Sequence, residues 1–237
     1  MGCTATLKTA NELWKCIPKI IGDVIYELKK SDDKKDFIGY YEGKEIIRVP
    51  AHQFQVPAQI NFVKTTYNVE NKDVFDRNSK IVFTRLISDL CNDFDRNKLI
   101  LQIIKSLKGY SIVISERVEQ LHYLSEKTPN SICIDGKTNK KLREKMVEEF
   151  RQGEYKVLFA SYSLVAEGLD IPMLENLIMA SPVKDSRLVV QSIGRCQRPY
   201  NGKKIANIYD LIDDVSMLDR FTRERRKVYK KEGWEMK

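Results

Sequence analysis

Two short runs between Lys156 and Arg198 decide how the rest of the chain is interpreted. Residues 160–172 have the sequence ASYSLVAEGLDIP and follow an apolar strand candidate, and residues 191–198 have the sequence QSIGRCQR. Taken singly, each run has an ordinary explanation. Gly-Leu-Asp can be a plain turn, and Arg195 and Arg198 can be solvated neighbours on one helix face. Their order and separation favour a joint interpretation.

Together the two runs resemble motifs V and VI of the superfamily 2 helicases, whose motors are built from RecA-like domains. The resemblance implies that ATP binds between two such domains and that this one supplies arginines to its γ-phosphate. It makes Arg198 the arginine finger and Arg195 its companion. It also places Gln191 near the phosphates, and Gly168 and Asp170 near the ribose. A guanidinium suits this task because its planar fork binds phosphate oxygens in pairs and stays charged.

A third segment extends the resemblance toward nucleic acid. The strand candidate Ser111–Ser115 and the residues after it resemble motif IV, in the style of the branch that contains phage UvsW, XPB and the transcript-release helicases of large DNA viruses. For Arg117, a phosphate contact and an ordinary exposed helix start stay equally open. The residues that the resemblance assigns to a nucleic-acid track are Ser161, Ser115, Arg117, Gly136 and Lys137.

The first residues of the chain resemble a further motif. Met1-Gly2-Cys3-Thr4-Ala5-Thr6 is similar to motif III, a Ser/Thr-Ala-Thr run that ends a strand of the first RecA-like domain. The similarity implies that Thr4 and Thr6 couple the two motor halves and that most of the first domain is absent. We therefore expect a remnant of that domain and a junction in residues 1–55, and the second RecA-like domain in residues 56–237.

Strand and helix candidates alternate from residue 60 onward, which is typical of a parallel sheet with helices on both faces. The expected strands are 60–67, 111–115, 131–134, 156–160, 177–180 and 205–211, after a short one at 45–49. The expected helices are 79–90, 96–107, 118–126, 139–152, 186–195 and 219–231. This predicts an α/β, RecA-like fold with ligands at the carboxyl ends of the strands, where Ser115, Gly136, Ser161 and Asp170 fall.

Charge indicates a polyanionic partner. The net charge is +8, and from Lys184 to the end 14 Lys and Arg stand against 8 Asp and Glu, which leaves +6 in the last quarter. A basic surface beside these motifs favours nucleic acid, DNA or RNA. The residues Arg220, Arg223, Arg225, Arg226 and Lys227 on the last helix are interpreted as a solvated face more than as a dedicated site.

The remaining composition excludes other classes of protein. Five scattered cysteines without a C-x-x-C pair argue for reduced thiols in an intracellular protein and against a zinc site. No run of about 18 apolar residues suggests a membrane span. The start lacks the features of a secretory signal.

A phosphate-binding loop is not found in this sequence. Asp135-Gly136-Lys137-Thr138 ends like one, but the required earlier glycine position holds Ser131. No acidic run that would hold Mg²⁺ is found either. We therefore expect ATP to be shared with a missing domain that holds Mg²⁺, and the chain alone to be inactive. The rival interpretations are a non-catalytic nucleic-acid-binding or interaction module with the same fold, and a split gene product whose partner carries the P-loop.

Overall fold

The computed structural model describes residues 26–30, 36–41, 44–50, 55–166 and 169–237. The chain divides into two compact units, Met1–Phe54 and Gln55–Lys237. In the first, β1 (Tyr26–Lys30), β2 (Asp36–Tyr41) and β3 (Lys44–Pro50) form an antiparallel sheet. The strand expected at 45–49 is thus confirmed. That residues 1–55 are a remnant of a RecA-like domain stays a prediction.

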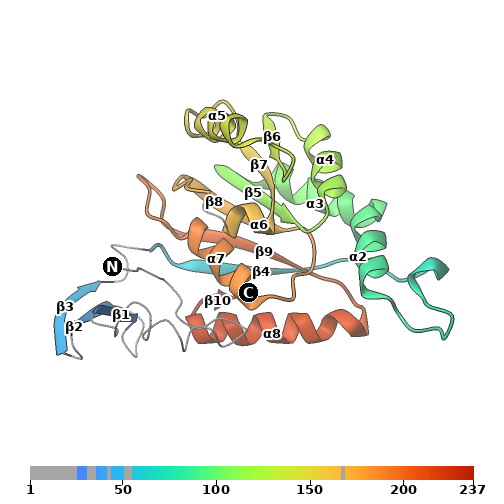
Figure 1. Cartoon of the computed structure of the whole chain (residues 1–237), viewed down its shortest axis with the longest axis horizontal. Coiled ribbons are helices and arrows are strands. Elements are labelled where there is room, and N and C mark those ends of the chain that lie inside the picture. Colours follow the sequence, from blue (N-terminus) through green and yellow to red (C-terminus); the bar gives the residue numbers. More distant parts are fainter. Residues whose placement is uncertain (1–25, 31–35, 42–43, 51–54, 167–168) are drawn as a thin grey trace. The chain divides into compact units, whose positions relative to one another are not determined.

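The second unit is built on one seven-stranded parallel sheet of order β10-β4-β9-β8-β5-β7-β6 (Figure 1). Its strands are β4 (Ala58–Lys64), β5 (Tyr110–Ser115), β6 (Ser131–Ile134), β7 (Val157–Ser161), β8 (Leu174–Met179), β9 (Ala206–Ile212) and β10 (Glu235–Met236). Its helices are η3 (Lys72–Val74), α2 (Phe83–Asn92), α3 (Phe94–Ser106), α4 (Val118–Glu126), α5 (Lys140–Arg151), α6 (Tyr162–Ala166), α7 (Ser186–Cys196) and α8 (Ser216–Glu232).

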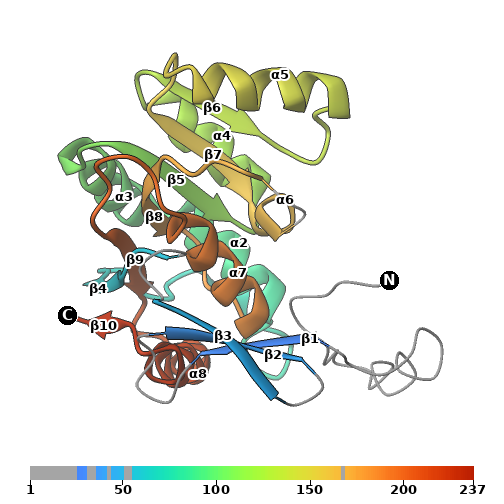
Figure 2. The same cartoon turned by 90° about the vertical axis from the view of Figure 1, so that its left-hand side faces the viewer.

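Alternation along the central strand β5 explains the layers. Ile112 and Ile114 point to one face and join a core with side chains from α5, α6, α7 and α8, whereas Val113 points to the other face and packs with α3 and α4. A third apolar cluster lies between α2 and the start of α8. Both faces of the sheet are therefore covered by helices (Figure 2), and the predicted α/β fold with a parallel sheet is confirmed.

Two buried ion pairs fix β9 and the residue that follows it against the helices α3 and α8. Asp213 accepts hydrogen bonds from Arg96 Nε (2.7 Å) and Nη2 (3.2 Å), and both side chains are almost fully buried. Asp210 forms a two-pronged pair with Arg225 (2.9 and 2.8 Å) and also accepts from the Tyr229 hydroxyl at 2.8 Å. The expectation that Arg225 lies on a solvated face is wrong, because its guanidinium neutralises a carboxylate beneath α8.

Most expected elements are found within a few residues of their predicted limits. The helix expected at 79–90 begins only at Phe83, because Ser79 has a positive φ of 58° and belongs to the turn that pairs Phe75 with Ile81. The strand expected at 60–67 is β4, which ends at Lys64. Within the described ranges, no helix is long and apolar enough to cross a membrane.

Candidate functional site

The two sequence runs that opened the argument meet at the amino edge of the sheet, because Asp170 comes four residues before β8 and the Gln197 carbonyl oxygen accepts from Val56 N, two residues before β4. The expectation that Asp170 lies at the carboxyl ends of the strands is therefore wrong, since the chain has already crossed back to the start of the next parallel strand. The first leaves β7 and passes through α6 to Leu169, which is buried, and Asp170, which is exposed. The second is the end of α7. The Asp170 carboxylate forms an ion pair with the Arg198 guanidinium, joining Oδ1 to Nη1. Their side chains remain 57% and 34% exposed, so the guanidinium is accessible to another anion.

Two further cations hold the main chain of this junction. Arg151, from the last turn of α5, donates to the Asp170 carbonyl oxygen from Nε (3.1 Å) and Nη2 (2.5 Å). The Lys203 ammonium donates to the carbonyl oxygens of Pro172 (3.0 Å) and Arg198 (2.9 Å). Burial lowers the pKa of Lys203 to about 8. The segment after Gly168 is therefore tied to both α5 and the chain after α7.

The predicted companion residues lie along α7, but Arg198 does not. The helix starts at the Asp185 cap, whose carboxylate accepts from Arg187 N at 2.9 Å, and it ends at Cys196. Gln191 is exposed and Arg195 is half-buried in the last turn. Arg198 follows the helix, so the alternative in which the two arginines are solvated neighbours on one helix face does not hold. The chain turns there because Gln197 bonds to Val56 through backbone and side chain.

Gly194 leaves open space on the same helix. A β-carbon at this position would meet no heavy atom within 4 Å. Packing within the described part of the chain therefore does not explain the glycine. The space is compatible with close approach of a ligand to the backbone.

The loop after β6 carries two of the predicted nucleic-acid contacts. Gly136 and Lys137 are exposed, and their loop is held by the buried carboxylate of Asp135, which accepts from Lys137 N (2.9 Å) and Thr138 N (3.0 Å). A hydrogen bond from His122 Nε2 (3.0 Å) is the main reason that the pKa of Asp135 is lowered. Internal hydrogen bonds thus fix the loop while its outer face stays open.

Ser161 and Ser115 end neighbouring strands but differ in exposure. The Ser161 hydroxyl is half-buried, 3.0 Å from the Ser163 hydroxyl. Ser115 is fully buried, donates to Gln120 Oε1 (2.7 Å) and accepts from Arg117 N (3.1 Å). The prediction of a nucleic-acid contact by the Ser115 side chain is therefore corrected: this hydroxyl is enclosed and stabilises the start of α4.

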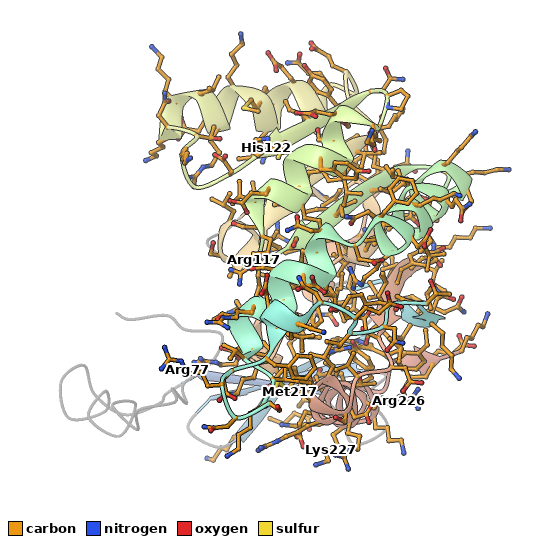
Figure 3. All side chains as sticks on the ribbon, turned by 90° about the vertical axis from the view of Figure 1, so that its right-hand side faces the viewer. Arg77, Arg117, His122, Met217, Arg226 and Lys227 are labelled. Atoms are coloured by element: carbon orange, nitrogen blue, oxygen red, sulfur yellow. The ribbon has the colours of Figure 1, made fainter. Side chains whose placement is uncertain are left out.

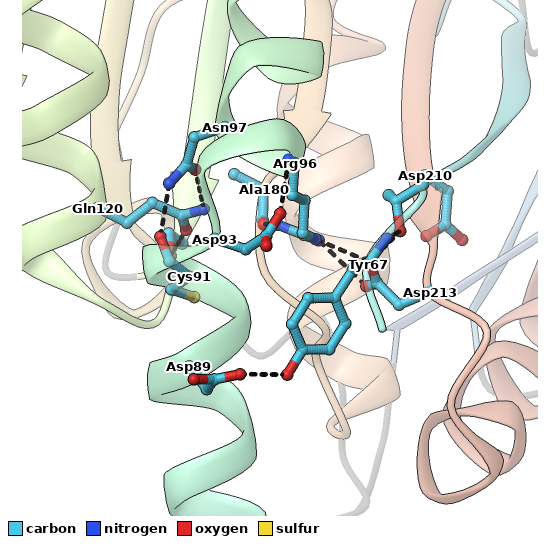
Figure 4. Close-up of polar contacts among 12 residues, drawn as sticks. Tyr67, Asp89, Cys91, Asp93, Arg96, Asn97, Gln120, Ala180, Asp210 and Asp213 are labelled. Atoms are coloured by element: carbon cyan, nitrogen blue, oxygen red, sulfur yellow. Dashed lines mark hydrogen bonds and ion pairs between the residues drawn. The ribbon is translucent and has the colours of Figure 1, made fainter. Parts of the chain in front are cut away.

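A buried polar chain extends from Ser115 to α2. Gln120 Nε2 donates to Asn97 Oδ1 (2.9 Å), and Asn97 Nδ2 donates to the Cys91 carbonyl oxygen (2.8 Å). Figure 4 shows these bonds beside the Arg96–Asp213 pair. Because each member satisfies the next, the chain links β5, α4, α3 and α2, and Ser115 at its end also holds the Arg117 backbone.

Arg117 lies at the surface between α2 and α4 (Figure 3). Its Nη2 donates to the Thr84 carbonyl oxygen at 3.0 Å, and the residue lines a polar pocket of about 840 Å³ with residues of α2. Its guanidinium is therefore held to α2 rather than freely solvated. The predicted residues Thr4, Thr6 and Gly168 lie outside the described residues.

Residues 95–200 match the family profile described as helicase conserved C-terminal domain. The match covers 106 of the 237 residues, and this part of the chain is similar to helicase C-terminal domains. Protein 161L of Invertebrate iridescent virus 6, a helicase by name, is 27% identical over 241 residues, which cover 95% of this chain and 52% of 161L. The DNA 3'-5' translocase XPB2 of Sulfurisphaera tokodaii is 26% identical over 155 residues, covering 65% of this chain and 35% of XPB2.

A solved structure agrees on the fold. The crystal structure of T4 UvsW matches with a TM-score of 0.58 at 18% identity, covering 76% of this chain and 40% of UvsW. The resemblance to the UvsW and XPB branch is confirmed, because both are among the proteins to which this chain is similar. The chain spans about half or less of the length of these relatives.

Sequence reasoning missed two residues, Arg151 and Lys203, that hold the site together. Lys203 follows Asn201 and Gly202 in a polar turn, so nothing in the pattern distinguished it from a solvated lysine. Arg151 looked like an ordinary helix-end cation. Only the folded chain shows that each donates to main-chain oxygens of the Asp170 segment or of Arg198.

Proposed function

We propose that this chain is the C-terminal motor half of an ATP-dependent nucleic-acid helicase or translocase. In this proposal Arg198 is the arginine finger and Arg195 is its companion. Gln191, Gly168 and Asp170 lie on the surface that faces the nucleotide. ATP supplies the free energy of each cycle. The loop that binds its phosphates and the ligands of its Mg²⁺ belong to a P-loop-bearing domain, in cis or in trans. Thr4 and Thr6 couple that domain to this one.

The ion pair between Arg198 and Asp170 carries the proposal. It presents a partly exposed guanidinium directly after α7, beside the last residues of the first run. An exposed pair of this kind contributes only about 0–1 kcal/mol, so Arg198 can exchange a carboxylate for a more highly charged phosphate at little cost. Arg151 and Lys203 keep the backbone of both partners in place during that exchange. The open space at Gly194 supports the same assignment.

The nucleic-acid track is assigned to the carboxyl edge of the sheet, where β5, β6 and β7 end. Ser161, Gly136 and Lys137 contact the backbone of one strand, and Arg117 adds a phosphate contact from the start of α4. Ser115 acts indirectly, by holding the backbone of Arg117. Closing and opening of the two motor halves on this strand converts hydrolysis into steps along it.

The experiment requires the chain joined to its P-loop-bearing half by co-expression or fusion. Arg198→Ala should lower ATP turnover by about 10³-fold or more, because the guanidinium meets charge that develops on the γ-phosphate only in the transition state. Nucleic-acid affinity should stay within about twofold of the parent. Arg198→Lys should not restore turnover, since one ammonium lacks the planar fork.

A surface arginine on α8 provides the matched control. Arg226 is unsuitable, because its guanidinium lies 4.3 Å from the centroid of the Phe62 ring and its loss removes packing. Arg223 is exposed, and Arg223→Ala should leave turnover unchanged. Equal, modest losses from Arg198→Ala and Arg223→Ala would show that the motif VI assignment is wrong.

The rival function is a non-catalytic nucleic-acid-binding module, supported by the lack of a P-loop in this sequence. It predicts that no joined half restores hydrolysis. The motor proposal predicts negligible turnover by the 237-residue chain alone and turnover on joining. Steady-state ATPase assays of the chain with and without its partner half distinguish the two.

A further inference from the structure

We propose that a groove at the amino edge of the sheet binds an acidic, amphipathic segment of a partner protein. The groove has a volume of about 740 Å³ and lies between the end of α3, the start of β5, the turn after α4 and the start of β7. It is separated from the candidate nucleic-acid residues at the carboxyl edge by the length of β5, roughly 16 Å at about 3.3 Å per residue. It lies on the face of the sheet covered by α3 and α4, whereas α7, which leads to Arg198, covers the other face. The proposed motor function does not use it.

The groove combines an apolar floor with a rim of one charge. Ile104, Leu107 and Val157 form the floor, and Ile104 and Val157 also belong to the core beneath. Four exposed lysines lie on the rim: Lys105, Lys108, Lys127 and Lys156. No carboxylate is among the residues that line the groove. Glu175 lies beside Gly109 but does not line the groove.

Three of the rim segments are held in place before any partner arrives. The Lys156 ammonium lies 4.0 Å from the Tyr110 ring centroid, and that of Lys127 lies 5.0 Å from the Tyr123 ring centroid. The Lys108 carbonyl oxygen accepts a hydrogen bond from Asn176 Nδ2 at 2.7 Å. A pre-formed groove lowers the ordering cost of binding.

These features favour a protein segment over nucleic acid. Glutamate and aspartate side chains of a partner would complement the charge of the four lysines. Its leucine or phenylalanine side chains would pack against the aliphatic floor. A sugar–phosphate backbone would match the charge but would leave the floor unfilled. One helical turn that carries apolar side chains on one face and carboxylates on its flanks satisfies both parts of the groove.

The test uses fluorescence anisotropy with the whole chain and a labelled amphipathic peptide of about 15 residues, with leucines at helical spacing and glutamates between them. We expect binding at least tenfold tighter than for the same peptide with lysines in place of glutamates or serines in place of leucines. The double variant Lys105→Glu, Lys127→Glu should weaken binding at least tenfold. The control is Lys140→Glu, Lys141→Glu, the same charge change on exposed positions of α5, which should leave it within about twofold.

Three outcomes would overturn the proposal. They are no binding of the acidic peptide, equal binding of the basic or serine peptide, and equal losses in the two double variants. A single-stranded oligothymidylate of about 12 nucleotides is measured in parallel. If it competes with the peptide and loses affinity in the Lys105→Glu, Lys127→Glu variant, the groove belongs to a nucleic-acid surface and the protein-partner proposal fails.

Discussion

Lys203 donates to the carbonyl oxygens of Pro172 and Arg198, one from each of the two sequence runs. The protonation of its amine can therefore be tested through the stability of the folded chain. Its pKa in the folded chain, about 8, lies below the ordinary 10.5. Between these values the unfolded chain binds the proton and the folded chain does not, so folding becomes more favourable as the pH rises. The free energy of unfolding of the parent, relative to Lys203→Met, should therefore increase between pH 7.5 and pH 9.5. Urea titrations at each pH measure the difference, and a constant difference would contradict the shift.

The buried thiols give a second expectation at the scale of single residues. Burial raises the pKa of Cys91 to about 11 and that of Cys196 to about 12, and the two side chains are 2% and 0% exposed. Because the thiolate is the nucleophile, both should react with iodoacetamide at pH 8 far more slowly in the native chain than in urea. Peptide mapping by mass spectrometry follows each cysteine separately. Rapid native labelling of Cys196 would show that the end of α7 opens readily.

At the scale of elements, the polar chain beside Ser115 is the feature that most constrains α4. Gln120→Ala removes a donor to Asn97 and an acceptor of the Ser115 hydroxyl, leaving buried groups without partners. The loss should be about 1–3 kcal/mol in the free energy of unfolding. Glu119→Ala, one position earlier and exposed, is the control and should change it by less than about 0.5 kcal/mol. Similar losses from both would show that the buried polar chain is not what makes Gln120 matter.

Element limits were predictable where the signal is local. Apolar periodicity and flanking polar residues predicted α4 (118–126) and β6 (131–134) at their observed bounds. The start of α2 was predicted too early, because Ser79 takes a positive φ in a tight turn closed by the bridge between Phe75 and Ile81, which the apolar periodicity does not reveal. β10 was not predicted, since a strand of two residues has no periodicity and exists only because β4 offers an edge.

The same distinction applies to the candidate site. Motif spacing identified Arg198 and Asp170, which the fold brings together. It did not identify Lys203 or Arg151, because their contacts are to main-chain oxygens and leave no side-chain pattern. It also assigned Arg225 to solvent. A clue was available in Asp210, a carboxylate within an apolar strand, which needs a buried cation.

For the unit Gln55–Lys237 as a whole, the edge of the sheet depends on residues near the end of the chain. Trp234 is 7% exposed, packs on Tyr229 with ring centroids 5.9 Å apart, and precedes β10, whose pairing with β4 continues through Lys237 N to the Ile60 carbonyl oxygen at 2.9 Å. Trp234→Ala should lower the free energy of unfolding by about 3–5 kcal/mol. Trp234→Phe should cost clearly less, because the buried indole nitrogen has no hydrogen-bond partner. Chemical denaturation of both variants tests this; equal losses would contradict it.

The place of β4 between β9 and β10 has a consequence for synthesis on the ribosome. β4 is the first strand of its sheet to be made, yet both of its neighbours are among the last, and Thr65 at its end bonds to Asp213, 148 residues later. At roughly 5–20 residues per second, the nascent strand waits roughly 7–30 seconds for its partners. During that interval it offers two unpaired edges to other chains. We therefore expect soluble yield to depend on translation speed and on chaperones that cover β4 until β9 emerges.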